Sequence, residues 1–237
     1  MEQYSLIEHG FTVVEDIYSS EEIENFKYSD FDFEFPGQEG EIRAANVDFD
    51  FSKVVDIANR LRSSSFSIFM QKVIFKPAFE GSYETYHQDQ LFRLGQRLPS
   101  SNYLQFFMAM EDHDTAPLNV FIGSHKLGVL PHVVGMERNG NAKYRIPKHE
   151  LLKLKDSFVS LKLKKGSGVF FDYCLIHGSA SNSSPVDQPR LIVQMTQQPL
   201  EDIAHGSDRR DFETRVLREM LDNKLKKLGF SKMAAPA

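Results

Sequence analysis

Apolar and polar residues alternate over several short stretches of the chain, which is the pattern of β-strands. Residues 68–79 are rich in β-branched and aromatic side chains, and a turn at residues 80–82 separates them from a second run, 83–89. We predict that these two runs form a hairpin. Further strands are predicted at residues 103–110, 118–122, 158–163, 168–174 and 190–197, separated by segments rich in Gly, Pro, Ser and Asn. Strands at this frequency favour a β-sandwich or barrel.

Helical spacing occurs mainly outside this β-rich region. A short strand at residues 10–14 precedes a helix predicted from Ser20 to Lys27, which begins with the capping-box pair Ser19 and Glu22. A second helix is predicted over residues 51–64, where apolar side chains recur at near-helical intervals. Residues 29–50 lack a steady period and predict an irregular segment. A stripe of leucines predicts a C-terminal helix over residues 208–229.

The length and apolar content favour one domain covering residues 1–237. The 237 residues are 41% hydrophobic and include 20 Phe, which is enough to fill one substantial core. We divide the domain into a helical N-terminal part at about 1–66, a β-rich core at about 67–200, and the C-terminal helix.

Charge and cysteine content exclude several classes of function. A net charge of −5 and a pI near 5.9 provide no broad basic surface, so nucleic acid and anionic membranes are not expected as partners. Cys174 is the only cysteine, which excludes an internal disulfide and a cysteine-rich zinc or iron–sulfur site. The single cysteine fits a reducing, cytoplasmic setting. The first ten residues lack the features of a signal peptide and no apolar stretch is long enough to span a bilayer, so we expect neither export nor membrane insertion.

Candidate metal chemistry lies at the end of the predicted strand 83–89. His87 and Asp89 are two residues apart, so on a strand their side chains would share one face. His177 follows another apolar strand and precedes a glycine, where a side chain can face a cavity. Two histidines and one carboxylate with open positions opposite are the ligand set of non-heme Fe(II) oxygenases. The alternative is that His-x-Asp occurs here by chance and each histidine is only a hydrogen-bonded strand-end residue.

Arg190 is a candidate for holding a carboxylate. It begins the strand after His177, and the intervening loop allows the chain to return to the same cavity. A guanidinium suits bidentate capture of a carboxylate, and in this class of iron site the natural carboxylate is the far end of 2-oxoglutarate. The alternative is a surface ion pair of Arg190 with Asp172 or Asp187.

Several ordered motifs together resemble the phytanoyl-CoA dioxygenase family of Fe(II)/2-oxoglutarate-dependent oxygenases. These motifs are Tyr86-His87-Gln88-Asp89, Gly123-Ser124-His125-Lys126, Leu175-Ile176-His177-Gly178-Ser179 and Arg190, within a resemblance that runs from about residue 5 to residue 198. The resemblance implies a mainly β fold with flanking helices around a double-stranded β-helix core, which is a cupin-like jelly roll. It implies Fe(II) held by His87, Asp89 and His177, with O2 and 2-oxoglutarate as cosubstrates. The distal carboxylate of 2-oxoglutarate would bind Arg190 and Ser179, and Gln105 is a further candidate contact.

The departures from the family pattern are few. Tyr86 stands where a tryptophan is common, Ile122 stands where a proline is usual, and the loop from His177 to Arg190 is slightly long. Asp89 is present, whereas related halogenases replace this carboxylate with a small residue. We therefore expect an enzyme that hydroxylates an unactivated C–H bond of a small-molecule metabolite and releases succinate and CO2. Desaturation, cyclisation or epimerisation at the same iron, or ligand binding without catalysis, are the alternatives. The choice between a CoA ester and a free metabolite stays open, as does the oligomeric state.

Other residues near these motifs have simpler expected roles. Gln90 and Phe92 follow the metal motif directly and are predicted to line the substrate pocket. His125 is predicted to be a loop residue that fixes backbone near the site rather than a metal ligand. His132 lies in polar surroundings and is expected to be solvated, whereas Cys174 is expected to be a buried small apolar residue.

Overall fold

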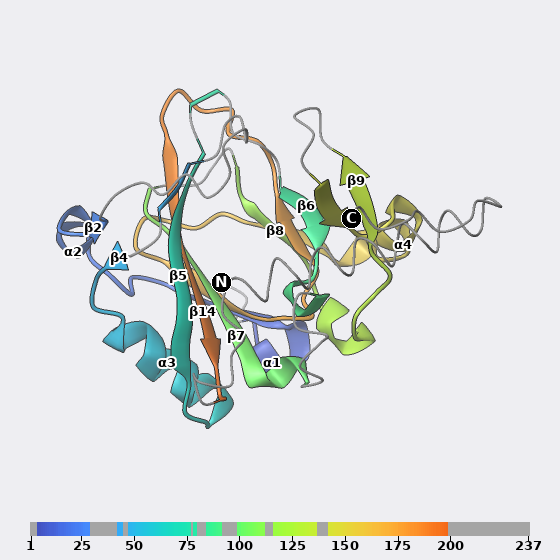
Figure 1. The fold of residues 1–237 in the computed structure, drawn as a ribbon, viewed down its shortest axis with the longest axis horizontal. Helices are drawn as coiled ribbons and strands as arrows, with labels where there is room; N and C mark the ends of the chain where they lie inside the picture. The colour runs from blue at the N-terminus through green and yellow to red at the C-terminus, as the bar shows by residue number, and fades with distance from the viewer. Residues whose placement is uncertain are drawn as a thin grey trace, which may run out of the picture.

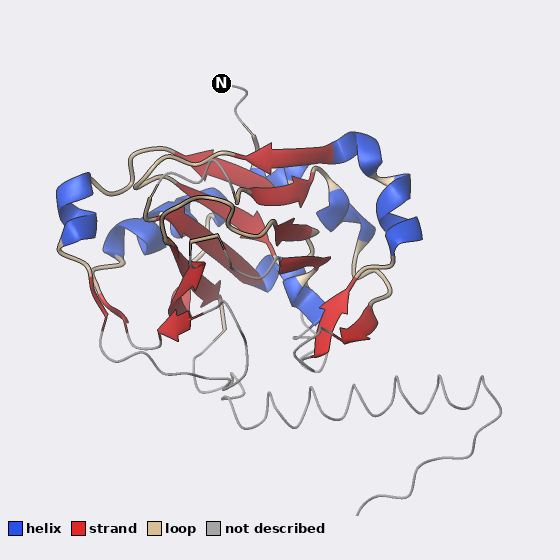
Figure 2. Cartoon of the chain, turned by 90° about the horizontal axis from the view of Figure 1, so that it is seen from above, coloured by secondary structure: helices blue, strands red, loops and turns tan. Residues whose placement is uncertain are grey.

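A computed structural model of the chain describes residues 4–28, 42–44, 47–76, 78–79, 84–91, 99–111, 116–136 and 142–198. Two facing β-sheets form its centre, and Figure 2 shows helices at the outside of these strands. The six-stranded sheet has the order β1 (Phe11–Val14), β12 (Gly168–Asp172), β7 (Tyr103–Ala109), β14 (Gln188–Thr196), β5 (Ser67–Lys76), β3 (Ile42–Ala44). The four-stranded sheet has the order β11 (Phe158–Leu161), β8 (Leu118–Phe121), β13 (His177–Ser179), β6 (Glu84–His87).

The chain passes back and forth between these two sheets. The strands β5, β6, β7 and β8, which Figure 1 labels, alternate between the six-stranded and the four-stranded sheet. The strands β11, β12, β13 and β14 alternate in the same way. This is the double-stranded β-helix expected from the sequence. The predicted hairpin of residues 68–79 with 83–89 is wrong, because β5 and β6 lie in different sheets. Each of the two strands turns one row of side chains toward the space between the sheets. Strands that follow each other in the sequence can therefore share the same core without pairing by hydrogen bonds.

Each face of the six-stranded sheet buries a different core. Between the sheets, Phe107, Val169 and Phe171 pack against Leu118 and Val120. On the opposite face, alternate residues of the same strands pack with helix α3 (Ser52–Arg62), which contributes Val54 and Ala58. The helix predicted over residues 51–64 is confirmed. In the figure, α3 lies beside the β5 end of the sheet (Figure 1).

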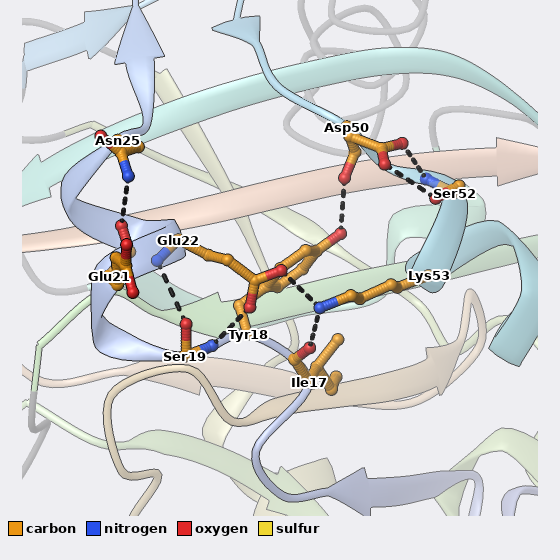
Figure 3. Close-up of polar contacts among 9 residues, drawn as sticks. All are labelled: Ile17, Tyr18, Ser19, Glu21, Glu22, Asn25, Asp50, Ser52 and Lys53. Carbon is orange, nitrogen blue, oxygen red and sulfur yellow. Dashed lines mark hydrogen bonds and ion pairs between the residues drawn. The ribbon is translucent and has the colours of Figure 1, made fainter.

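Helix α2 (Ser20–Glu24) is joined to the start of α3 by polar contacts, which Figure 3 shows. The predicted capping box is present, since Ser19 Oγ accepts from Glu22 N and Glu22 Oε2 accepts from Ser19 N. Lys53 of α3 reaches Glu22, and the Tyr18 hydroxyl donates to the carbonyl of Asp50 at 2.8 Å. The helix ends at Glu24, three residues before the predicted end, because the chain then forms β2 (Lys27–Tyr28).

The remaining described elements are short. They are α1 (Leu6–His9), β4 (Val47–Asp48), which pairs with β2, the pair β9 (Val133–Met136) and β10 (Ala142–Arg145), α4 (Lys148–Lys153), and the 3-10 turns η2 (Ser100–Asn102), η3 (Ser124–Leu127) and η4 (Lys155–Ser157). Two strands from the first 66 residues, β1 and β3, belong to the six-stranded sheet. The predicted C-terminal helix over 208–229 and most of the irregular segment 29–50 lie outside the described residues. Within the described ranges, each helix is too short or too polar to cross a membrane.

Candidate metal and cosubstrate site

The two predicted histidine ligands lie directly opposite each other on neighbouring strands. In the antiparallel pairing of β13 with β6, His177 is opposite His87, and the two ring centroids are 4.4 Å apart. Directly opposite residues of a sheet project from the same face. The sequence placed His177 at the end of the strand 168–174, whereas it begins a strand of its own after a turn. That turn carries the chain from the six-stranded to the four-stranded sheet and brings the imidazole to His87.

Asp89 completes the cluster from a turn rather than from a strand. Strand β6 ends at His87, and a tight turn follows in which Leu91 N donates to Gln88 O at 3.2 Å. The expectation that His87 and Asp89 share one face of a strand is therefore wrong, because Asp89 lies after the strand has ended. The turn nevertheless puts Asp89 Oδ1 3.6 Å from His87 Nε2 and Asp89 Oδ2 3.8 Å from His177 Nε2. One ligand atom from each of the three residues lies within 4.8 Å of the others.

Backbone contacts fix which nitrogen of each histidine faces this cluster. His87 Nδ1 lies 2.7 Å from Thr85 O, and His177 Nδ1 lies 3.0 Å from Leu175 O. A carbonyl oxygen can only accept, so each Nδ1 carries the proton and donates it. Each Nε2 then faces Asp89, and in the neutral imidazole it carries the lone pair that can bind a metal. This arrangement, with Nδ1 held by a hydrogen bond and Nε2 aimed at a common point, is how proteins orient histidine ligands to a metal.

The carboxylate of Asp89 keeps its charge despite its burial. Burial alone raises the pKa of Asp89, but the opposing effects of His177, His87 and Lys72 bring it down to about 2. Asp89 Oδ2 is buried and has no hydrogen-bond partner among the described residues. A buried carboxylate oxygen that faces the Nε2 atoms of two histidines is the mixed nitrogen and oxygen ligand set that first-row divalent metals prefer. A divalent cation satisfies such a set, so the residues fit a metal ion.

Gln88 holds the backbone between the two motif residues in place. Its side-chain amide donates to Cys174 O at 2.6 Å and to Gly128 O at 2.8 Å, and its Oε1 accepts from Leu130 N at 2.8 Å. Its backbone N–H donates to His132 Nε2 at 3.2 Å. The expectation that His132 is solvated is wrong, since this side chain is buried and supports the turn. Burial lowers the pKa of His132 to about 4, which keeps the imidazole neutral and able to accept.

Arg190 is buried between the sheets and reaches the strand that carries His177. Its Nη1 donates to Ser179 Oγ at 3.1 Å, its Nη2 donates to Ala116 O, and its guanidinium lies 5.6 Å from the centre of the Phe107 ring. The proposed surface partners are engaged elsewhere, since Asp172 pairs with Arg62 and Asp187 accepts from Ala78 N. Ser179 is two residues from His177 on β13, so the arginine and the histidine cluster face one interior space.

Lys76 is a second buried cation in this space, and it was not predicted from the sequence. Only 1% of the residue is exposed, and its Nζ donates to Ser179 Oγ at 2.7 Å and to Ala180 O at 2.6 Å. Ser179 Oγ thus accepts from both Lys76 and Arg190, so its own proton points away from both. Strand β5 gave a signal that could have found it, because Lys72, Ile74 and Lys76 alternate on one face.

The structure describes three of the four other residues considered in the sequence. Gln105 is buried on β7 and its Oε1 accepts from Gln194 Nε2 at 2.9 Å. Gln90 is buried, with its N–H donating to Tyr173 O at 2.9 Å, whereas Phe92 lies outside the described residues. His125 contacts Ile7 O of helix α1 through Nε2 at 3.0 Å, and it does not belong to the three-residue cluster.

Comparison with known proteins identifies the family. The model of the family described as phytanoyl-CoA dioxygenase (PhyH) matches residues 38–190. The chain belongs to this family of Fe(II)/2-oxoglutarate-dependent oxygenases. The match spans strand β6 with His87, the turn with Asp89 and strand β13 with His177, and it ends at Arg190. The resemblance seen in the sequence motifs is confirmed.

Individual relatives of this PhyH-family chain are distant. An ectoine dioxygenase of Bordetella parapertussis is 26% identical over 160 residues, covering 63% of this chain and 51% of that protein. The chain thus spans about half the length of the curated relatives it matches. EctD from S. alaskensis with 2-oxoglutarate and 5-hydroxyectoine gives a TM-score of 0.59 at 17% identity, covering 81% of this chain and 73% of that one. EvdO2 from Micromonospora carbonacea var. aurantiaca with 2-oxoglutarate gives 0.61 at 17% identity, with coverages of 87% and 93%. These likenesses confirm the jelly-roll fold.

Proposed function

We propose that this protein is an Fe(II)/2-oxoglutarate-dependent dioxygenase that hydroxylates a small-molecule metabolite. The observation that carries the proposal is the convergence of His87, Asp89 and His177, whose ligand atoms lie within 4.8 Å of one another. Bound Fe(II) supplies the activation of O2, in which one oxygen atom enters a substrate C–H bond as hydroxyl while 2-oxoglutarate gives succinate and CO2. That the enzyme works in the cytoplasm stays a prediction from its single cysteine.

In this proposal the three residues hold the metal through one carboxylate oxygen and two Nε2 atoms. The Nδ1 bonds to Thr85 O and Leu175 O keep both rings in the ligating tautomer before the metal arrives. The low pKa of Asp89 supports a ligand that is already ionised at neutral pH. Three protein ligands leave further coordination positions for the cosubstrate and for O2.

Arg190, Ser179 and Lys76 form the proposed site for the distal carboxylate of 2-oxoglutarate. Lys76 and Arg190 both donate to the hydroxyl of Ser179, so two cationic side chains meet at one point of the interior, which suits an anionic group of the cosubstrate. Ser179 lies on the same short strand as His177, so an anion held at Ser179 orients its molecule toward the metal cluster. Phe107, under the guanidinium, shields this end from water.

The carboxylate of Asp89 favours hydroxylation over halogenation, since a halogenase needs that coordination position for the halide. The chain also retains every proposed ligand and the arginine, which argues against a binding protein without catalysis. Neither argument separates hydroxylation from desaturation, cyclisation or epimerisation, which depend on how the substrate sits at the iron.

The metal assignment is tested by replacing Asp89. Asp89→Ala should keep the far-ultraviolet circular dichroism of the native fold but lose the weak visible band that Fe(II) and 2-oxoglutarate give together without oxygen. Succinate formation should fall to background, because two imidazoles alone hold the metal weakly. His149→Ala, which removes an exposed histidine, is the matched control. Full band intensity in Asp89→Ala would remove the assignment.

The cosubstrate assignment is tested by replacing Arg190. Arg190→Ala should raise the 2-oxoglutarate concentration needed for half-maximal band intensity by about tenfold or more, since a charge-assisted bond contributes ~1.5–3 kcal/mol. Metal affinity measured with Zn(II) alone should change little. An unchanged 2-oxoglutarate requirement would show that other residues hold the cosubstrate.

A further inference from the structure

The spacing of residues on the inner face of β14 gives approximate distances along the interior of the barrel. Arg190, Ile192 and Gln194 alternate on the face toward the other sheet, whereas Leu191 and Val193 belong to the outer core with α3. Same-face residues of a strand are ~7 Å apart, so Gln194 lies ~13 Å along the strand from Arg190. The three side chains therefore mark successive levels within the barrel.

The proposed cosubstrate occupies only the first part of this distance. 2-Oxoglutarate has five carbons in a row, so from an anchor at Arg190 its keto acid end reaches about one two-residue strand step, ~7 Å, to the level of Ile192. Phe107 is opposite Ile192 on β7, and Gln105 is opposite Gln194. Phe171 is opposite Gln105 on β12, and its ring lies 4.8 Å from the ring of His177, so the level of Gln105 and Gln194 adjoins the metal cluster, where the reacting part of a substrate has to lie.

A pair of carboxamides occupies this second level. Gln194 Nε2 donates to Gln105 Oε1 at 2.9 Å, and the two residues are 8% and 5% exposed. This bond uses one N–H of Gln194, whereas the pair contains four N–H groups and two carbonyl oxygens. The pair can therefore offer both a donor and an acceptor to an uncharged group such as an amide or a hydroxyl. An apolar group placed there would desolvate these atoms without replacing their hydrogen bonds, which costs ~1–3 kcal/mol for each.

Lys72 adds a positive charge at the level between the two anchors. It is opposite Ile192 on β5 and alternates with Ile74 and Lys76, so it projects into the same interior. The side chain is partly exposed, unlike Lys76. A cation on the inner face of the sheet with access to solvent suits one carboxylate of an entering molecule.

We propose that the substrate is a small hydrophilic carboxylate whose anionic group binds Lys72 and whose amide or hydroxyl group binds the Gln105–Gln194 pair. The inference rests on the proposed function and narrows it, because it excludes an apolar acyl chain at the reacting position. It also assigns Gln105 to the substrate, whereas the family resemblance suggested a contact with 2-oxoglutarate.

The test uses three matched probes that differ by one group each. N-acetyl-β-alanine has an amide and a carboxylate, hexanoate has the carboxylate alone, and N-propylacetamide has the amide alone. Each is titrated by ligand-observed NMR into protein loaded with Zn(II) and 2-oxoglutarate, which fills the site without turnover. The variants are Gln194→Met, Gln105→Met and Lys72→Met. Gln71→Leu is the control, because Gln71 is opposite Val193 and therefore lies on the other face of the strand.

The wild-type protein should bind N-acetyl-β-alanine about tenfold more tightly than either other probe, as expected for one added hydrogen bond or charge contact. Gln194→Met and Gln105→Met should bring its affinity to that of hexanoate, and Lys72→Met to that of N-propylacetamide. Gln71→Leu should keep the wild-type order.

Equal or undetectable binding of the three probes to the wild type would overturn the inference, and so would an unchanged order in the glutamine variants. Weaker 2-oxoglutarate binding in Lys72→Met or Gln105→Met, measured by calorimetry on the Zn(II) protein, would assign that residue to the cosubstrate and overturn its role here. If wild-type Zn(II) protein fails to bind 2-oxoglutarate at all, the proposed function fails, and the inference fails with it. Normal 2-oxoglutarate binding without probe preference overturns the inference alone.

Discussion

The ion pair between Arg62 and Asp172 should be the most destabilising charge contact to break among the described residues outside the site. Arg62 Nη2 lies 2.6 Å from Asp172 Oδ2, and the side chains are 16% and 4% exposed. The pair joins the end of α3 to the last residue of β12. Asp172 Oδ1 also accepts from Cys174 N at 2.8 Å, in the turn that leads to His177.

The variant Arg62→Met removes the cation and leaves the buried carboxylate without its partner. Breaking one side of a buried pair costs ~3–5 kcal/mol, since the remaining charge is neither solvated nor compensated. Asp172→Asn should cost less, ~2 kcal/mol, because Arg62 is nearer to solvent and the amide oxygen can still accept from Cys174 N. Asp172→Ala should cost ~1 kcal/mol more than Asp172→Asn, the value of that hydrogen bond.

Urea unfolding followed by circular dichroism measures these free energies of unfolding. The exposed pair of Lys53 with Glu22 is the control, since its side chains are 47% and 40% exposed. Lys53→Met should cost at most ~1 kcal/mol, because solvent screens that pair. The double variant of Arg62→Met with Asp172→Asn should lose less free energy of unfolding than the two single variants together, as expected for partners in contact. A loss below ~1 kcal/mol in Arg62→Met would refute the reasoning that burial decides the size of the effect.

Two further predictions concern the pH dependence of folding and a backbone constraint. The pKa of His132 is 6.5 in the unfolded chain and about 4 in the folded protein, so between these pH values the unfolded chain binds the extra proton. The free energy of unfolding therefore keeps its full value above pH 6.5 and decreases as the pH falls toward 4. The 2.5-unit difference sets an upper limit of ~3 kcal/mol, and the free energy of unfolding of His132→Gln should accordingly depend less on pH across that window; parallel pH profiles for both proteins would disprove this. Gly166 has φ +81°, and an added Cβ would lie 2.0 Å from Tyr18 O, so Gly166→Ala should destabilise by ~3 kcal/mol or more. Gly128→Ala, at φ +67° with open space around it, should lose only ~1–2 kcal/mol in thermal unfolding, and equal losses at the two glycines would contradict the steric argument.

The chemistry of the site was readable from the sequence because it depends on residue types. His87, Asp89 and His177 were predicted from their ligand chemistry and from motifs, and Arg190 from the match of a guanidinium to a carboxylate. The strand pattern also gave a β-sandwich or barrel and the helix over 51–64. The local structure that carries Asp89 and His177 was predicted wrongly for both residues. Asp89 lies on a turn and His177 begins its own strand, because the crossing of the chain between two sheets is not written in local periodicity.

What only the tertiary structure decided is which side chains become neighbours across the sheets. In the sequence, Lys76 is only one lysine of an alternating strand. In the structure it donates to Ser179 of β13, which belongs to the other sheet. The Gln105–Gln194 pair exists only because β14 pairs with β7 in one particular register, which brings together residues 89 positions apart. His132 was expected in solvent, since the polarity of its own loop gave no sign that Gln88 would bury it. The sequence determined the donors, acceptors and charges, and the pairing of strands determined which of them meet, because contacts between distant segments depend on register and sheet order rather than on local composition.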